Sequence, residues 1–189
     1  MLWLYCICTT AVKNARLGSF AVYLLGVVVR VMKASPFFML FVYRALEKHG
    51  DAALVLRMIR QRYGSMLDAR ATTLWENWQL FYKSATGGVK FQSASHAWAA
   101  MPLVFAAEQL LGINIAEAGF TKVIIAPKLF DLDYAEGTVV TPGGEYGVAV
   151  IRESGGIRVK ATVPAGCEAW IGGELHREGT HHVLLPDAK

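Results

Sequence analysis

Residues Tyr134–Val163 read YAEGTVVTPGGEYGVAVIRESGGIRVKATV and decide the fold of the C-terminal half. Two glycine-rich turns, TPGG at 141–144 and SGG at 154–156, separate three apolar runs. These runs are Tyr134–Thr141, Glu145–Glu153 and Arg158–Val163. Turns of this composition join neighbouring antiparallel strands. In the last run apolar and polar residues alternate, which is typical of a strand with one buried face. The stretch therefore predicts an antiparallel sheet.

Working outward, three more short runs extend this pattern to six strands, enough for a small antiparallel β-sandwich: Lys122–Ala126, Glu168–Ile171 and His181–Leu185. The pattern of apolar residues changes near Gly119. Before it they recur at helical spacing, and after it they form the short strand-like runs separated by glycines. We therefore expect an α+β chain with two domains, residues 1–118 and 119–189.

The helical part contains start and stop signals. Ser35-Pro36 predicts a helix start and Gly50 its end. Asp51 begins a second helix that Gly64 is expected to stop, and the single turn between the two predicts an αα-hairpin. A third helix is expected from about Ser95 to Leu111. The aromatic-rich segment between Gly64 and Ser93 has no regular pattern, and such segments are usually functional.

Composition excludes several classes. Of the 189 residues, 54% are hydrophobic and 18% charged, which excludes disorder. A net charge of +4 without a basic run interleaved with aromatics argues against nucleic-acid binding. Three cysteines, Cys6, Cys8 and Cys167, fit neither a disulfide framework nor a zinc ribbon. This favours a reducing compartment, the cytoplasm over secretion.

The excess of apolar residues is concentrated in Leu17–Val29. The run is shorter than the roughly 18–20 residues that cross a bilayer, so no membrane span is predicted. It is similar to a signal-peptide core, but Pro36 would hinder cleavage after the small residues Ala34-Ser35. The favoured interpretations are a buried helix or a start codon that opens inside a longer gene; a membrane anchor over Phe20–Val29 is a further possibility.

Glu76 is the first candidate for chemistry, because it lies between Trp75 and Trp78. Indole rings are flat platforms for sugars, and a carboxylate beside them can activate water in a glycosidase. The alternative is structural: Thr73 followed three residues later by Glu76 is the pattern of a capping box at a helix start. The spacing does not decide between the two.

His96, in Ser93-Ala94-Ser95-His96, is the second candidate. A histidine at the first turn of a helix can donate to a substrate hydroxyl or hold a carboxylate in place. It can equally be a structural histidine whose ring is hydrogen-bonded to backbone groups at a helix N-terminus.

Two other clusters indicate no site. His176, His181 and His182 lack a cysteine or acid at ligand spacing, so a solvated strand edge is the better interpretation. Asp131 and Asp133 are not followed by the glycine and third acid of a calcium loop. No metal or cofactor is predicted.

Three segments in this order resemble the C-terminal end of bacterial α-L-rhamnosidases and related six-hairpin glycosidases: MLDARATTLWENW (66–78), SASHAWAAMP (93–102) and GFTKVIIAPKLFDLDYAEGTVVTPGGEYGVAV (119–150). In that family an (α/α)6 barrel ends in a helix after a Ser-x-x-His motif, and a small β-sandwich follows. The resemblance covers about residues 33–164. Residues 1–30 do not match it.

The resemblance implies roles for four residues. Glu76 matches the glutamate of the TTxWE motif, the general base that activates water in an inverting hydrolysis. His96 matches the substrate-contacting histidine, and Trp75 and Trp78 match positions that shape the sugar pocket. The implied partner is a carbohydrate substrate.

The chain also departs from the family pattern. It has room for about two helical hairpins, so an incomplete barrel is expected. The family's general acid lies in an acidic motif upstream, and the nearest upstream acids here, Asp51 and Asp68, are in no such context. We therefore expect the C-terminal portion of a longer glycosidase, inactive alone, whose partner is the missing N-terminal part of the same enzyme. The alternative is a non-catalytic carbohydrate-binding or structural module.

Overall fold

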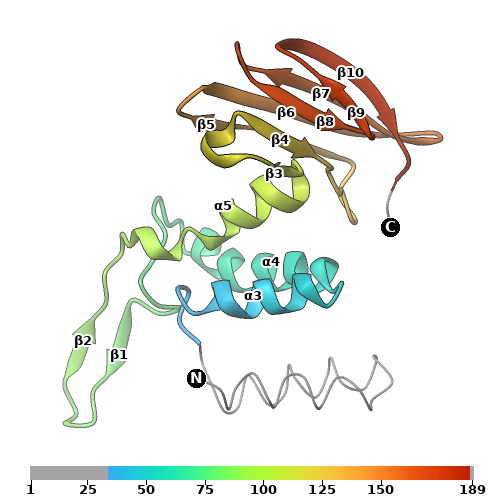
Figure 1. Cartoon of the computed structure of the whole chain (residues 1–189). Coiled ribbons are helices and arrows are strands. Elements are labelled where there is room, and N and C mark those ends of the chain that lie inside the picture. The colour runs from blue at the N-terminus through green and yellow to red at the C-terminus, as the bar shows by residue number, and fades with distance from the viewer. Residues whose placement is uncertain (1–33, 188–189) are drawn as a thin grey trace.

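The computed structural model describes residues 34–187, in which a helical part precedes a sandwich of two β-sheets (Figure 1). The mixed helix and sheet class expected from the sequence is confirmed. The apolar run Leu17–Val29 and the unmatched residues 1–30 lie outside the described residues. Within residues 34–187, no helix has the length and apolarity needed to cross a membrane.

Helices α3 (Met39–Lys48) and α4 (Ala52–Asp68) form the expected hairpin (Figure 1). The Phe38 N–H donates to Ser35 Oγ at 3.4 Å, so Ser35 caps the turn that leads into α3. The prediction that Gly64 ends the second helix is wrong. The helix continues because Met66, beyond Gly64, is buried, and burial outweighs the cost of about 1 kcal/mol of a helical glycine.

The helix expected over Ser95–Leu111 is present as three short pieces: the 3₁₀ turn η1 (Ala97–Ala99), α5 (Met101–Phe105) and the π-helical turn η2 (Ala106–Leu110). Pro102 lies in the first turn of α5. Because proline has no N–H to donate to an earlier turn, it suits a helix start and interrupts a continuous helix.

The segment between α4 and η1 contains a hairpin that the sequence analysis did not predict. Strand β1 (Phe81–Lys83) pairs with β2 (Val89–Phe91), and both project from the helical part (Figure 1). The Phe81 and Phe91 rings lie 5.3 Å apart, and both side chains are exposed. Strands of three exposed residues show no alternation of burial, which is why no pattern indicated them.

The sandwich consists of two four-stranded sheets with orders β10-β7-β6-β5 and β3-β4-β8-β9. Inward side chains of both sheets form one core, in which Val123, Val150 and Val159 are completely buried. The six predicted strands are all present, and β3 and β9 are additional. Their bounds are β3 (Ile113–Ile115), β4 (Lys122–Ile125), β5 (Tyr134–Thr141), β6 (Gly144–Glu153), β7 (Gly156–Val163), β8 (Glu168–Ile171), β9 (Glu174–His176) and β10 (Gly179–Leu185), with the turn η3 (Ala118–Phe120) before β4.

The expectation of purely antiparallel sheets is wrong for one pair, because β4 and β8 run parallel, with Val123 opposite Ala169. Between them the chain passes through the antiparallel strands β5, β6 and β7. Each of these three strands reverses the direction of the chain, which brings it back to the end of the sandwich where β4 begins. Strand β8 therefore runs in the same direction as β4.

Two ion pairs connect the helical hairpin with the segments leading into the sandwich, and one ring contact connects α5 with the loop that carries Asp131. Arg44 of α3 donates to both carboxylate oxygens of Glu108, once at 2.7 Å. Arg60 of α4 pairs with Asp131, and this hydrogen bond lowers the pKa of the Asp131 carboxyl. The Phe105 and Phe130 rings stack with centroids 6.0 Å apart, within the core of the helical part.

Gly112 joins η2 to β3 where two backbone segments meet. Its φ is +71°, and a Cβ there would lie 2.2 Å from the carbonyl carbon of Ala126 and from the Pro127 nitrogen. Its carbonyl accepts the Ala126 N–H at 3.0 Å, so neither segment can move away without losing this bond. Gly119 has a similar φ of +76° but open space around it.

We predict that Gly112→Ala destabilises the chain by more than about 3 kcal/mol, because the methyl group collides with backbone. The matched control Gly119→Ala should cost only about 1–2 kcal/mol, from its left-handed backbone alone. Urea unfolding of the full chain measures both free energies. Equal losses would show that the close approach at Gly112 does not constrain the fold.

Candidate functional site

The candidate site lies where residues 71–80 and 92–96 run beside each other. The Glu76 N–H donates to the Ser93 carbonyl at 2.9 Å, and the His96 N–H donates to the Leu74 carbonyl at 2.8 Å. The Thr73 hydroxyl adds a bond of 2.6 Å to the Ala94 carbonyl. These bonds fix the two segments relative to each other, although residues 71–80 form no helix and only Leu80 borders a strand.

The capping-box interpretation of Thr73 and Glu76 is therefore wrong, because no helix begins here. Instead of capping its own segment, the Glu76 carboxylate reaches across to the other one. Its Oε2 accepts the Ser93 N–H at 3.1 Å. A carboxylate held by a backbone N–H keeps one orientation, which a freely rotating surface glutamate does not.

The structure brings Glu76 and His96 together. The distance from His96 Nδ1 to Glu76 Oε2 is 4.0 Å, and both side chains are about one-third exposed. His96 directly precedes η1 with an extended backbone, so its ring lies at the start of a helical turn, as the sequence analysis expected. The two candidates from different segments thus form one solvent-accessible pair.

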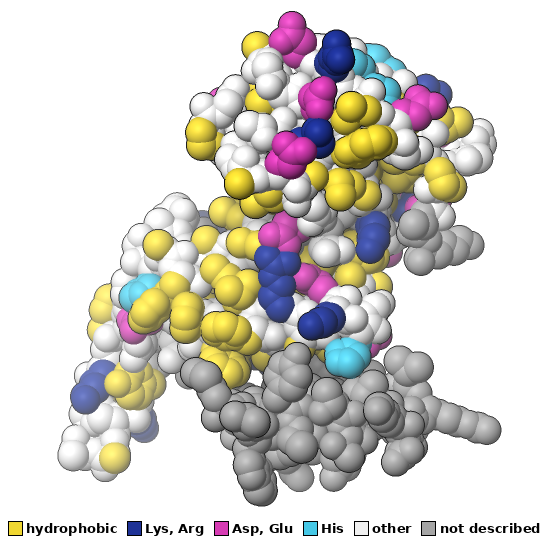
Figure 2. All heavy atoms as spheres, in the orientation of Figure 1, with side chains coloured by type: hydrophobic (Ala, Val, Ile, Leu, Met, Phe, Trp, Pro, Cys, Tyr) yellow, Lys and Arg dark blue, Asp and Glu magenta, His cyan; other side chains and the backbone are white. Residues whose placement is uncertain are grey.

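The His96 imidazole lies against an indole. Its ring centroid is 4.0 Å from that of Trp98, with 31° between the planes. Trp98 in turn contacts the Phe37 ring at 5.1 Å. In the view of Figure 2, hydrophobic side chains gather over the helical part of the molecule.

The two tryptophans that flank Glu76 in the sequence have different surroundings. Trp75 is half-buried. Trp78 packs against the core of the helical part, with its indole N–H donating to the Ala34 carbonyl at 2.6 Å. Its ring is nearly perpendicular to that of Tyr63, with centroids 5.1 Å apart, and the Arg62 guanidinium lies 5.4 Å from the Trp78 centroid.

Tyr63 on α4 holds the backbone next to the site in place. Its hydroxyl donates to the Ala99 carbonyl at 3.1 Å, directly after Trp98 in the chain. Burial raises the pKa of the Tyr63 hydroxyl above its usual range, and the nearby Tyr43 adds to this shift. The hydroxyl therefore stays protonated and keeps its donor role throughout the physiological pH range.

The other clusters lie apart from this pair. The His176 and His181 rings are 4.7 Å apart in the sandwich, and His182 is exposed on β10. Asp131 pairs with Arg60, and Asp133 lies 3.8 Å from Arg152. Among residues 34–187, no three His, Cys, Asp or Glu side chains gather as a metal site would require.

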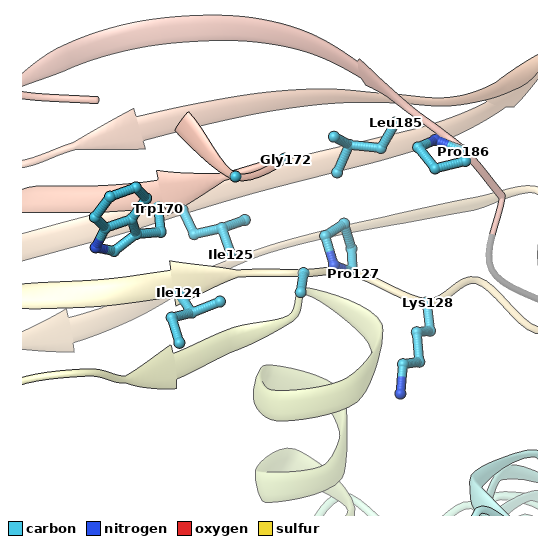
Figure 3. A pocket seen from close by; sticks show the side chains of 10 residues that line it. Ile124, Ile125, Pro127, Lys128, Trp170, Gly172, Leu185 and Pro186 are labelled. Atoms are coloured by element: carbon cyan, nitrogen blue, oxygen red, sulfur yellow. The ribbon is translucent and has the colours of Figure 1, made fainter. Parts of the chain in front are cut away.

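A concavity with a volume of about 560 Å³ lies on the sandwich, away from the Glu76–His96 pair (Figure 3). Its lining is mostly apolar and includes the exposed ring of Trp170, together with Ile124 and Pro186. Lys128 is the one charged residue in this lining.

Comparisons with known proteins agree with the resemblance found in the sequence. Residues 112–182, from the start of the sandwich into β10, match the family model described as the bacterial alpha-L-rhamnosidase C-terminal domain. The alpha-L-rhamnosidase of Alteromonas sp. (strain LOR) is 32% identical over 126 residues, covering 63% of this chain and 14% of that relative.

Solved structures are similar as well. The rhamnosidase of Bacillus sp. GL1 is 35% identical with a TM-score of 0.59, over 72% of this chain and 16% of that one. The alpha-L-rhamnosidase of Aspergillus terreus has a TM-score of 0.64 at 22% identity, over 77% and 18% respectively, and so shows the same fold. The similarity to the C-terminal part of bacterial α-L-rhamnosidases is thus confirmed. The chain spans less than a fifth of the length of each of these relatives.

Two residues at the site were not predicted as part of it. Ser93 contributes through its backbone N–H, which no side-chain pattern reveals. Trp98 is 45% exposed and lies against His96. The spacing His96-x-Trp98 is the signal that could have indicated it.

We predict that Trp78→Phe lowers the free energy of unfolding by about 1 kcal/mol, because the Ala34 carbonyl loses its donor. The control is Trp75→Phe, since the Trp75 indole N–H donates to no residue among 34–187. Urea unfolding of both variants measures the difference. If the two losses are equal, the Trp78 hydrogen bond does not anchor the site.

Proposed function

We propose that the chain supplies the general base of a glycoside hydrolase that cleaves terminal rhamnosyl or related bonds with inversion. The observation that supports this is the Glu76 carboxylate, held by the Ser93 N–H at 3.1 Å beside the His96 ring. Both contacts use Oε2, which leaves Oε1 without a partner among the described residues. A fixed and accessible carboxylate oxygen can take the proton of a water molecule as that water attacks the sugar carbon.

His96 and the tryptophans complete the proposed sugar site. An imidazole one-third exposed beside a carboxylate can donate to a sugar hydroxyl. Trp75 and Trp78 are proposed to line the pocket by their similarity to the family motif. The anchoring of Trp78 to Ala34 favours a role in which it holds the wall of the pocket.

Inverting hydrolysis needs a second carboxyl group that protonates the leaving oxygen. It lies roughly 6.5–9.5 Å from the base, which leaves room for the attacking water. Because the chain spans 14% of the Alteromonas relative, we propose that the acid comes from a further part of the enzyme and that this chain alone has no turnover. The proposed organisation is an incomplete (α/α) barrel in residues 1–118 and a sandwich in residues 119–189, to whose second sheet β3 adds an edge strand.

A non-catalytic carbohydrate-binding module is the second candidate, and the concavity around Trp170 favours it. An exposed indole on a sheet surface can stack on the face of a sugar ring. Its mostly apolar lining offers few hydrogen-bonding groups for sugar hydroxyls, so the Glu76 site is the stronger proposal.

The test places Glu76 in a complete enzyme. Residues 34–187 replace the matching part of the Bacillus sp. GL1 rhamnosidase, and hydrolysis of an aryl α-L-rhamnoside is measured. Glu76→Gln should lower kcat by about 10²–10⁴-fold, because an amide cannot accept the proton from water. KM should stay within about twofold, since the amide oxygen can still accept the Ser93 N–H.

The control is Glu145→Gln, an exposed glutamate on β6 of the sandwich, which should leave kcat unchanged. Near-normal hydrolysis by the Glu76→Gln chimera would contradict the assignment of the base. A chimera that is folded but inactive even with Glu76 intact would contradict the proposal that this chain carries the catalytic half-site.

A further inference from the structure

The aromatic contacts around His96 form a continuous stack that leads to the proposed base. The Phe37 ring lies 5.1 Å from Trp98, with 38° between the planes, and Trp98 lies 4.0 Å from His96. His96 Nδ1 is then 4.0 Å from Glu76 Oε2. Phe37 precedes α3 and Trp98 lies in η1, whereas His96 and Glu76 come from the two segments of the site.

The backbone that carries Trp98 is firmly held. The Ala99 N–H donates to the His96 carbonyl at 3.0 Å, and the Ala99 carbonyl accepts the Tyr63 hydroxyl at 3.1 Å. Ala99 itself is completely buried. The indole therefore projects from a fixed point, although 45% of Trp98 is exposed.

The imidazole of His96 has few other restraints. Among the described residues it has no hydrogen-bond partner, and its closest charged neighbour is the Glu76 carboxylate at 4.0 Å. The backbone N–H of His96 is already used in the bond to Leu74, which fixes the main chain but not the ring. The orientation of the ring thus depends on the surface against which it lies.

We propose that Trp98 is a positioning residue: its indole, supported by Phe37, holds the His96 imidazole with Nδ1 toward Glu76. This inference rests on the proposed function, in which His96 contacts the sugar that Glu76 acts on. A stacked ring loses little rotational freedom when a ligand arrives, so the site is arranged before the sugar binds. Trp98 acts through His96 and is not assigned a contact with the sugar.

The test uses the full chain and two substitutions, Trp98→Leu and Trp98→Phe. Stacking on an indole shifts the carbon-bound ring protons of His96 upfield in the NMR spectrum. Trp98→Leu should remove this shift, whereas Trp98→Phe should keep part of it, because phenyl also offers an aromatic face. Tyr134→Leu is the control, since Tyr134 is also an exposed aromatic residue, at 51%, but belongs to β5 of the sandwich and lines neither candidate sugar site.

The functional readout is the Kd for L-rhamnose, measured by calorimetry on the same chains. Trp98→Leu should raise this Kd up to about 10-fold, the range that the energy of an aromatic pair allows. Trp98→Phe should stay within about threefold, and Tyr134→Leu should match the original chain. Thermal unfolding of each variant shows that the fold is retained.

Unchanged His96 ring-proton shifts in Trp98→Leu would overturn the inference. So would a folded Trp98→Leu chain that binds L-rhamnose as tightly as the original, or a Trp98→Phe chain as weak as Trp98→Leu. Failure of the original chain to bind L-rhamnose would count against the proposed function, not the stack, because the ring-proton shifts are measured without ligand.

Discussion

The hydrogen bond from the Ser93 N–H to the Glu76 carboxylate is the interaction on which the account of the site depends. It links two segments that lack regular structure, so neither a helix nor a sheet sets the position of the carboxylate. The backbone hydrogen bonds of Glu76 to Ser93 and of His96 to Leu74 hold the two segments together instead. The site is therefore ordered by a few specific contacts, which a single substitution can disturb.

The rest of the molecule explains why these segments can hold their geometry. Tyr63 on α4 fixes the backbone at Ala99, and Trp78 fixes the first segment to Ala34. The core of the helical part extends through Phe105 to Phe130, at the entrance to the sandwich. The sandwich has its own core, and Gly112 lets the link between η2 and β3 pass close to the backbone of Ala126 and Pro127. The site thus lies on the helical part, whose packing continues toward the sheets.

The sequence was most informative where the spacing of apolar residues reflects burial. Strands β5 and β8 have the predicted bounds, because apolar and polar residues alternate along each and a glycine-rich turn follows each. The parallel pairing of β4 with β8 was not predictable from either strand, since it depends on the path of the chain between them. Likewise, Glu76 and His96 could be named as candidates, but the contact between them arises from backbone bonds that carry no residue-type signal.

The most direct measurement is the position of L-rhamnose in a crystal structure of the full chain with this sugar. The account predicts the sugar beside the Glu76 and His96 side chains, within hydrogen-bond distance of at least one, with the Ser93 bond to Glu76 intact. Sugar bound only in the concavity around Trp170, with the Glu76 site empty at saturating L-rhamnose, would contradict it. That result would favour a binding module built on the sandwich.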